Sequence, residues 1–332
     1  MPVTNKIRIF ATQKDTKMKL INISRTATDH QVYMQSFCEA WIAGGGDYIT
    51  PSRWAHSRWA VRAMKLLAIC RLCRPVGSET YLVCARGGHL LRAAMPYAFK
   101  GNIVPMLWDC WPDTWKTLER DLRLLRCQVC HVTSTDVAKQ LAKRLPQIKF
   151  IYIHEGVATN DYHAGAELSQ RSIDVYELGD KHNYYHKRLI DSPHHEQWNF
   201  VYNADRKQKG MQLTFDSFSE FTQNIADSKI VVSFPKSMRD PRRNGIVSTL
   251  TIRYWEAMLS RCIIVGHCPQ ELIDIIGYNP VIEADFVNAA GQIDHILKHL
   301  DHYQPMVDYN RKMALKYASW QLNDILAQPN HT

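Results

Sequence analysis

The chain has 332 residues, of which 45% are hydrophobic and 22% are charged, a composition typical of a globular protein with a large core. No uninterrupted apolar run reaches the ~18 residues that a membrane-spanning helix requires, and residues 1–15 lack the apolar core of a secretory signal. We therefore expect a cytoplasmic protein, and the length favours two domains over one.

The net charge of +9 is distributed unevenly along the chain. Residues 1–170 contain 23 lysines and arginines against 13 acidic residues, whereas the remainder contains 18 against 19. This asymmetry favours an anionic partner for the first half, either acidic lipid or nucleic acid.

Strand-like and helix-like runs alternate along the first half. Strands are predicted at 19–26, 80–88, 102–111, 127–134 and 149–157, and helices at 29–43, 52–74, 89–99, 112–126 and 134–146. Short β-branched runs separated by helical patterns indicate βαβ units on a parallel sheet. We predict a Rossmann-like domain over 1–165, with the polar stretch 158–171 as a linker.

A second alternating series follows the linker. Its strands are predicted at 172–179, 198–203, 229–235, 262–266 and 279–285, and its helices at 183–190, 211–227, 250–261 and 269–277. The fold class is therefore α/β, with two doubly wound domains in tandem, the second over 166–310. Residues 311–332 are predicted to form a helix that crosses back to the first domain.

Two cysteine pairs have the C-x-x-C spacing of zinc sites, Cys70/Cys73 and Cys127/Cys130. The second pair lies in a predicted strand, where residues three apart face opposite sides, and the pairs are far apart in the sequence. We expect the nine cysteines to act as small buried hydrophobes, and we predict no metal site.

A basic loop lies between a strand end and a helix start in the second domain. It contains Lys236, Arg239, Arg242 and Arg243, and the predicted helix begins near Thr251. Free backbone N–H groups, the positive end of the helix dipole and the cations together favour a phosphate or diphosphate. The alternative is an ordinary solvated loop.

An acidic residue, Glu256, is expected in the first turn of that helix. On its own, this position is explained by the favourable interaction of an acid with the helix dipole, worth about 0.3 to 1 kcal/mol.

The sequence "RYWEAMLSRCIIVG", followed by "CPQELIDIIGYNPVIEAD", resembles the nucleotide-sugar-binding region of GT-B glycosyltransferases of group-1 type, known from bacterial surface polysaccharide synthesis. The resemblance covers about residues 171–286, and over the first half it is only architectural. It implies that Glu256 binds the ribose of a nucleotide-sugar donor, that Ser248, Thr249 and Thr251 form a phosphate-binding turn, and that Lys181 lies near the donor.

The chain departs from the family pattern at three positions, one of which is Asp180, followed by Lys181, where an arginine is often found after the strand glycine. Ser248 stands where many retaining members have a second glutamate, and Arg261 stands where glycine usually ends the helix. The choice between retention and inversion therefore stays open, and retention is favoured.

In the first domain, candidate residues follow the predicted strands. Asp109 is expected near the reacting centre, with Trp108 and Trp111 stacking on the acceptor sugar; capping of the next helix is the alternative for Asp109. Gly87 and Gly88 would allow an acceptor to approach the backbone, and His89 is either an acid–base group or a helix-start residue.

The predicted helix at 52–74 places Arg58, Arg62 and Lys65 on one stripe and Trp59 and Leu66 on another. A basic stripe beside tryptophans is typical of a helix on an anionic membrane, and the alternative is an ordinary surface helix.

These expectations define a glycosyltransferase that moves a sugar from a nucleotide-diphosphate donor to a glycan or lipid-linked acceptor. No D-x-D motif is present, so we expect Lys236, the arginines and the helix start to neutralise the leaving group without a metal ion or another cofactor. The alternatives are a GT-B-fold epimerase of the nucleotide sugar and a non-enzymatic basic protein that binds nucleotides or nucleic acid.

Overall fold

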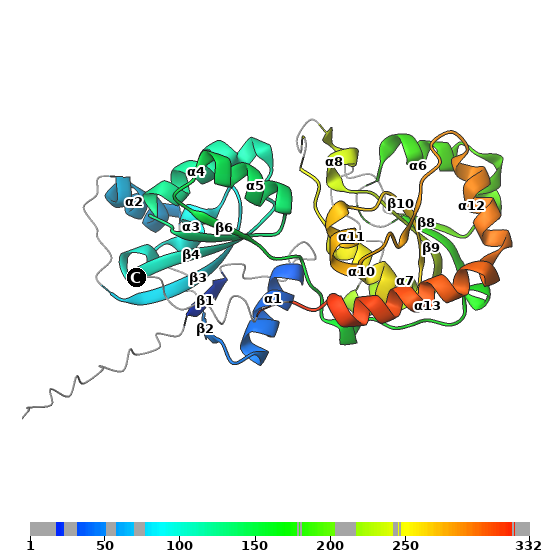
Figure 1. Ribbon diagram of the computed structural model, residues 1–332, viewed down its shortest axis with the longest axis horizontal. Helices are drawn as coiled ribbons and strands as arrows, with labels where there is room; N and C mark the ends of the chain where they lie inside the picture. Colours follow the sequence, from blue (N-terminus) through cyan, green and yellow to red (C-terminus); the bar gives the residue numbers. More distant parts are fainter. Residues whose placement is uncertain are drawn as a thin grey trace, which may run out of the picture.

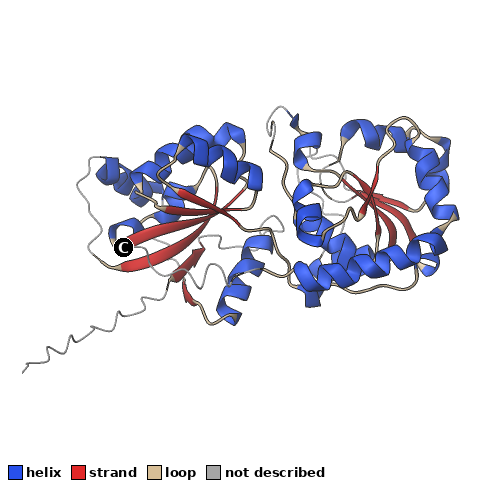
Figure 2. Ribbon diagram, viewed as in Figure 1, coloured by secondary structure: helices blue, strands red, loops and turns tan. Residues whose placement is uncertain are grey.

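The computed structural model describes residues 18–22, 32–50, 58–69, 77–177, 179, 181–202, 217–241, 245, 247–320 and 322. Two separate parallel sheets, each flanked by helices, lie side by side (Figures 1 and 2). The α/β class and the two doubly wound units predicted from the sequence are confirmed.

The first sheet has the strand order β2-β1-β3-β4-β5-β6. Its strands are β1 (Lys19–Asn22), β2 (Asp47–Ile49), β3 (Glu79–Arg86), β4 (Gly101–Trp108), β5 (Val129–Val132) and β6 (Lys149–Tyr152). The accompanying helices are α1 (Val32–Ala43), α2 (Arg58–Ile69), α3 (Leu90–Ala94), α4 (Trp115–Leu124) and α5 (Thr135–Arg144). Strand β2 was not predicted, because three residues after a run of glycines carry no readable periodicity.

The second sheet has the order β11-β10-β9-β7-β8. Its strands are β7 (Ile173–Glu177), β8 (Phe200–Tyr202), β9 (Ser228–Ser233), β10 (Ile263–Gly266) and β11 (Val281–Glu283). Its helices are α6 (Asn183–Ile190), α7 (Phe218–Ala226), α8 (Lys236–Arg239), α10 (Ile252–Leu259), α11 (Gln270–Ile276), α12 (Ala289–Lys298) and α13 (Leu300–Tyr317).

The central strands of the second sheet are buried on both faces. In β10, Ile263 and Val265 pack into one hydrophobic cluster and Ile264 packs into the cluster on the opposite face. A parallel strand covered by helices on both sides needs a continuous apolar run, which explains why "CIIVG" was recognisable as a strand.

The chain passes between the two domains twice, and the two passages lie against each other. The amide of Val157, after β6, donates to the carbonyl of Ala318, after α13, at 2.8 Å. Trp320 then packs edge-on against Phe37 and Trp108 of the first domain. The helix predicted for 311–332 is shorter than expected, since α13 ends at Tyr317 and residues 318–320 are not helical.

All seven described cysteines are buried and unbridged. Cys127 and Cys130 belong to the hydrophobic core of the first domain, and burial raises the pKa of both thiols. Cys70 and Cys73 lie outside the described residues. Among the described helices, none combines the length and the apolar character needed to span a membrane.

Candidate functional site

Each sheet has a point where the strand order reverses, and open parallel sheets bind ligands in the crevice at the carboxyl ends of the strands beside that point. In the second sheet the reversal lies between β7 and β9. The segment after β7 contains Gly179 and Lys181, and the segment after β9 leads into Lys236. The two lysines predicted to bind a donor therefore both follow the strands that flank this point.

In the first sheet the order reverses between β1 and β3. Strand β3 ends at Arg86 and leads into Gly87, Gly88 and His89, while Asp109 directly follows the neighbouring strand β4. The acceptor-side candidates are thus adjacent at the corresponding edge of the first sheet.

Asp109 has left-handed backbone geometry, with φ of 51°, which is uncommon for a residue other than glycine. Its Oδ2 lies 3.4 Å from the Nε of Arg86, and both side chains are about one-third exposed. The helical segments that follow begin after Trp111 and Thr114, and neither start has a side-chain cap. The carboxylate therefore pairs with Arg86 instead of capping a helix.

The glycines beside Asp109 have different surroundings. A Cβ added to Gly87 would lie 3.0 Å from the Cα of Cys110, so this glycine makes room for the protein itself rather than for an acceptor. Gly88 and His89 are exposed. His89 precedes α3 without a side-chain capping bond, which leaves its imidazole at the surface of the crevice edge.

The two tryptophans predicted to stack on an acceptor are buried. Trp108 is fully buried in the core against Phe37 and Trp320, so its predicted acceptor contact is wrong. As the last residue of β4, it points to the face covered by α1. Trp111 is 5% exposed, and Lys236 Nζ lies 4.4 Å from its ring centroid. Its ring face is occupied by a lysine from the second domain.

Glu256 lies in the second turn of α10, not in the first, because the helix begins at Ile252. The dipole explanation weakens accordingly, since that interaction falls off within the first turn. The carboxylate is buried and accepts a hydrogen bond from the hydroxyl of Tyr162 at 3.0 Å. Burial raises the pKa of Glu256 to about 7, while Tyr162 and the charge of Arg253 oppose that rise.

Two charged residues of this region were not among the predicted site residues. Arg253 lies one turn before Glu256 on the same face of α10, a spacing that the sequence already contained. Glu155, in the segment between the domains, accepts from the backbone N–H of Ile252 at the start of α10. Burial raises the pKa of Glu155 to about 8, and the charges of Asp109 and Glu271 add to that rise. The strand predicted for 149–157 ends at Tyr152, so Glu155 lies in the segment after the strand and not within it.

The segment before α10 is bonded to the first domain. The amide of Ser248 donates to Asp136 at 3.0 Å, and its carbonyl accepts from Ser134 at 2.9 Å. The hydroxyl of Thr249 donates to the carbonyl of Thr133 at 3.0 Å. Thr251 is the residue immediately before α10, and its side chain makes no capping bond. Of the three residues predicted for a phosphate turn, only Thr251 is not used to join the domains.

Glu271 of α11 completes this junction. Its carboxylate accepts from the amide and hydroxyl of Thr135, at the start of α5, and from the amide of Leu250. The junction therefore brings the starts of α5 and α10 close together.

The basic groups around this junction come from several elements. Gly179, with φ of 70°, touches the guanidinium of Arg253, since an added Cβ would lie 2.3 Å from its Nη2. The loop after β7 therefore lies beside the first turn of α10. Arg239 belongs to α8, next to Lys236, whereas Arg242 and Arg243 lie outside the described residues.

No family model matches the chain, and no curated protein does. Solved structures do match. One is HepE (Alr3699) from Anabaena in complex with UDP and glucose, with a TM-score of 0.57, 9% identity and coverage of 91% of this chain and 96% of that one. Another is a glycosyltransferase from Rickettsia africae, with a TM-score of 0.53, 11% identity and coverage of 92% and 95%. At these identities the likeness concerns the fold, and the chain has the GT-B fold.

Proposed function

We propose that this protein is a glycosyltransferase that transfers a sugar from a nucleotide-diphosphate donor to a hydroxyl of a glycan or lipid-linked acceptor. The observation that carries the proposal is that Lys181 and Lys236 follow the neighbouring strands β7 and β9, while Arg253, which touches Gly179 of the loop after β7, lies one turn before buried Glu256 on α10. The fold supports it, because HepE, a structure similar over almost the whole chain, contains UDP and glucose.

In this proposal the donor diphosphate lies at the start of α10. Lys181, Lys236, Arg239 and Thr251 bind it and stabilise the charge that develops on the leaving group, with no metal ion, and Arg243, outside the described residues, stays a predicted member of this set. Glu256 then accepts hydrogen bonds from the ribose hydroxyls.

Asp109 acts on the acceptor side, with His89 beside it. If the anomeric configuration is inverted, Asp109 removes the proton of the acceptor hydroxyl as a general base. If it is retained, the donor phosphate accepts that proton on the same face, and Asp109 positions the acceptor. Retention is the version we favour.

Thermal-shift measurements with UDP-, GDP-, ADP- and CMP-sugars test the proposal. We expect one nucleotide class to raise the melting temperature of the wild type, because a ligand that binds only the folded state stabilises it. The Asp109→Asn variant should keep that shift and lose turnover. No shift with any nucleotide would contradict the donor site, and interconversion of the donor sugar without an acceptor would favour the epimerase.

The surface of α2 supports a second proposal, that the protein binds an anionic membrane at the cytoplasmic face. Trp59, Leu66 and Ile69 are 78%, 62% and 59% exposed, and Arg62 lies over the Trp59 ring at 5.5 Å. The helix holds no acidic residue. Exposed apolar groups beside cations match an anionic lipid surface, where a lipid-linked acceptor would be found.

Flotation with lipid vesicles tests this surface. We expect the protein to bind phosphatidylcholine vesicles that contain phosphatidylglycerol more tightly than pure phosphatidylcholine. Arg62→Gln should weaken the binding roughly five-fold, since a cation near such a surface contributes about 1 kcal/mol. Ile42→Ser, at an exposed apolar position of α1, is the control. Equal binding to both vesicle types would contradict the proposal.

A further inference from the structure

A buried acid ends strand β7. Glu177 is 1% exposed, and its Oε2 lies within hydrogen-bond distance of the Nδ1 of His186 on α6. Its other oxygen, Oε1, has no hydrogen-bond partner among the described residues. A buried carboxylate is costly unless compensating charge lies nearby.

The compensating charge comes through the imidazole. The other ring nitrogen of His186, Nε2, lies 3.5 Å from the Nζ of Lys181. A lysine ammonium can only donate, so Nε2 must accept and Nδ1 must carry the proton that His186 donates to Glu177. The three side chains thus form one chain of hydrogen bonds, from the ammonium through a neutral imidazole to the carboxylate.

The ammonium has a second fixed contact. Lys181 Nζ lies 4.7 Å from the ring centroid of Tyr202, at the end of β8. A free lysine loses rotamer entropy when it is ordered. The contacts with His186 and Tyr202 supply part of that ordering.

The imidazole also keeps the acid away from the lysine. His186 lies between the two charged groups, so Glu177 fixes the place of the ammonium through a neutral imidazole. The loop that carries Lys181 touches Arg253 through Gly179, which sets it beside the start of α10.

We propose that Glu177 and His186 are positioning residues, which hold Lys181 ready for the diphosphate of the donor. This inference rests on the proposed function of the same site. Neither residue needs to contact the donor, because both act by fixing the position of the Lys181 ammonium.

A double-mutant cycle on nucleotide binding tests the inference, with UDP, GDP, ADP and CDP each titrated by calorimetry. We expect Lys181→Met to weaken binding of the preferred nucleotide roughly ten-fold to a hundred-fold, the value of a charged hydrogen bond. His186→Phe should weaken it about two- to ten-fold, the cost of ordering one long side chain. In the Lys181→Met background, His186→Phe should have no further effect.

Two further variants separate positioning from folding. His186→Gln places an amide oxygen near the position of Nε2 and should restore most of the affinity. His195→Phe, a second histidine of the same domain that packs on Phe200, should leave the affinity unchanged. The inference would be overturned if His186→Phe lowered the affinity equally in the wild type and in the Lys181→Met variant. It would also be overturned if Lys181→Met weakened binding and His186→Phe did not. If none of the four nucleotides binds the wild type, the proposed function fails as well.

Discussion

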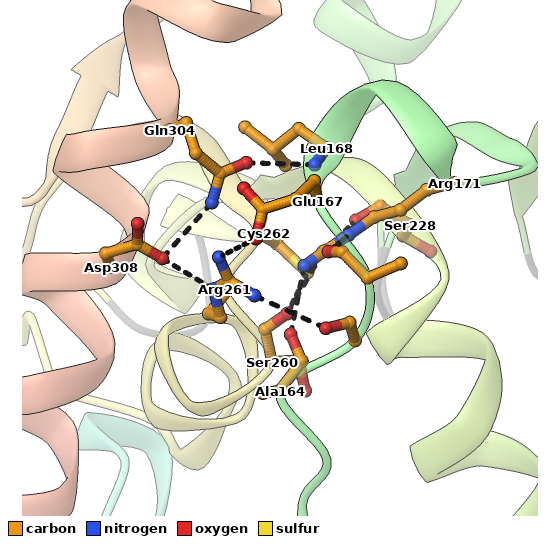
Figure 3. A network of polar contacts seen from close by, with 12 residues as sticks. Ala164, Glu167, Leu168, Arg171, Ser228, Ser260, Arg261, Cys262, Gln304 and Asp308 are labelled. Atoms are coloured by element: carbon orange, nitrogen blue, oxygen red, sulfur yellow. Dashed lines mark hydrogen bonds and ion pairs between the residues drawn. The ribbon is translucent and has the colours of Figure 1, made fainter.

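Replacing Arg171 with methionine is expected to lower the free energy of unfolding by about 3–5 kcal/mol, because several backbone carbonyls lose their donor and each buried unsatisfied group costs roughly 1–3 kcal/mol. Arg171 lies where the linker enters β7 and is 3% exposed. Its guanidinium donates to four backbone carbonyls, those of Ala164, Ala166, Ser228 and Ser260 (Figure 3). Methionine fills similar space but leaves these carbonyls without their donor.

The effect should be structural because Arg171 joins three elements. It ties the linker to the start of β9 and to the end of α10, and neighbouring Arg261 extends the network to Glu167 and to Asp308 of α13 (Figure 3). Arg261 adopts φ of 55°, a backbone conformation that favours glycine, just after the end of α10.

Urea unfolding followed by tryptophan fluorescence measures the prediction. Arg188→Met is the matched control. Arg188 is exposed, and among the described residues its side chain donates hydrogen bonds only to the hydroxyl of Tyr184. It should change the free energy of unfolding by less than about 0.5 kcal/mol. A similarly small change for Arg171→Met would show that the linker is held by other contacts.

Much of the fold was predictable because it depends on local patterns. The buried run "CIIVG" and the helix that precedes it differ from their surroundings in apolar content alone, so β10 and α10 were placed to within about two residues. Strand β2 carried no such signal, since a short edge strand is defined by its pairing with β1.

The site was less predictable, because its geometry depends on the face of the sheet to which each side chain points. It also depends on contacts with residues that are distant in the sequence. Trp108 continues the apolar pattern of β4. Successive side chains of a strand point to opposite faces, and the side chain of Trp108 points into the core. Ser248 and Thr249 are bonded to residues more than one hundred positions away in the chain. Glu155 likewise owes its place to the start of α10, which a sequence pattern does not link to it.

Replacing Glu256 with glutamine is expected to weaken donor binding roughly ten-fold to a hundred-fold at pH 8, because a neutral amide replaces a carboxylate that would accept from the ribose hydroxyls. Titration calorimetry with the nucleotide selected by thermal shift measures the loss. Glu196→Gln, at an exposed acid of the same domain, should bind normally. Unchanged binding by Glu256→Gln would remove the ribose role and leave only the bond to Tyr162.

The pH dependence of the same variant gives an independent test, because ribose binding favours the ionised form of Glu256 and folding favours the neutral form. With a pKa of about 7, its ionised fraction rises about ten-fold between pH 6 and pH 8, so wild-type affinity should rise over that range relative to Glu256→Gln. Burial favours the neutral form in the folded state, so the stabilisation is complete below pH 4.5 and is lost as the pH rises through 7. At pH 8 the glutamine variant should therefore be more stable than the wild type. At the same pH its affinity for the nucleotide should fall furthest below that of the wild type. If Glu256 has only a packing role, the stability difference between wild type and variant should change with pH. The ratio of their nucleotide affinities should then stay constant.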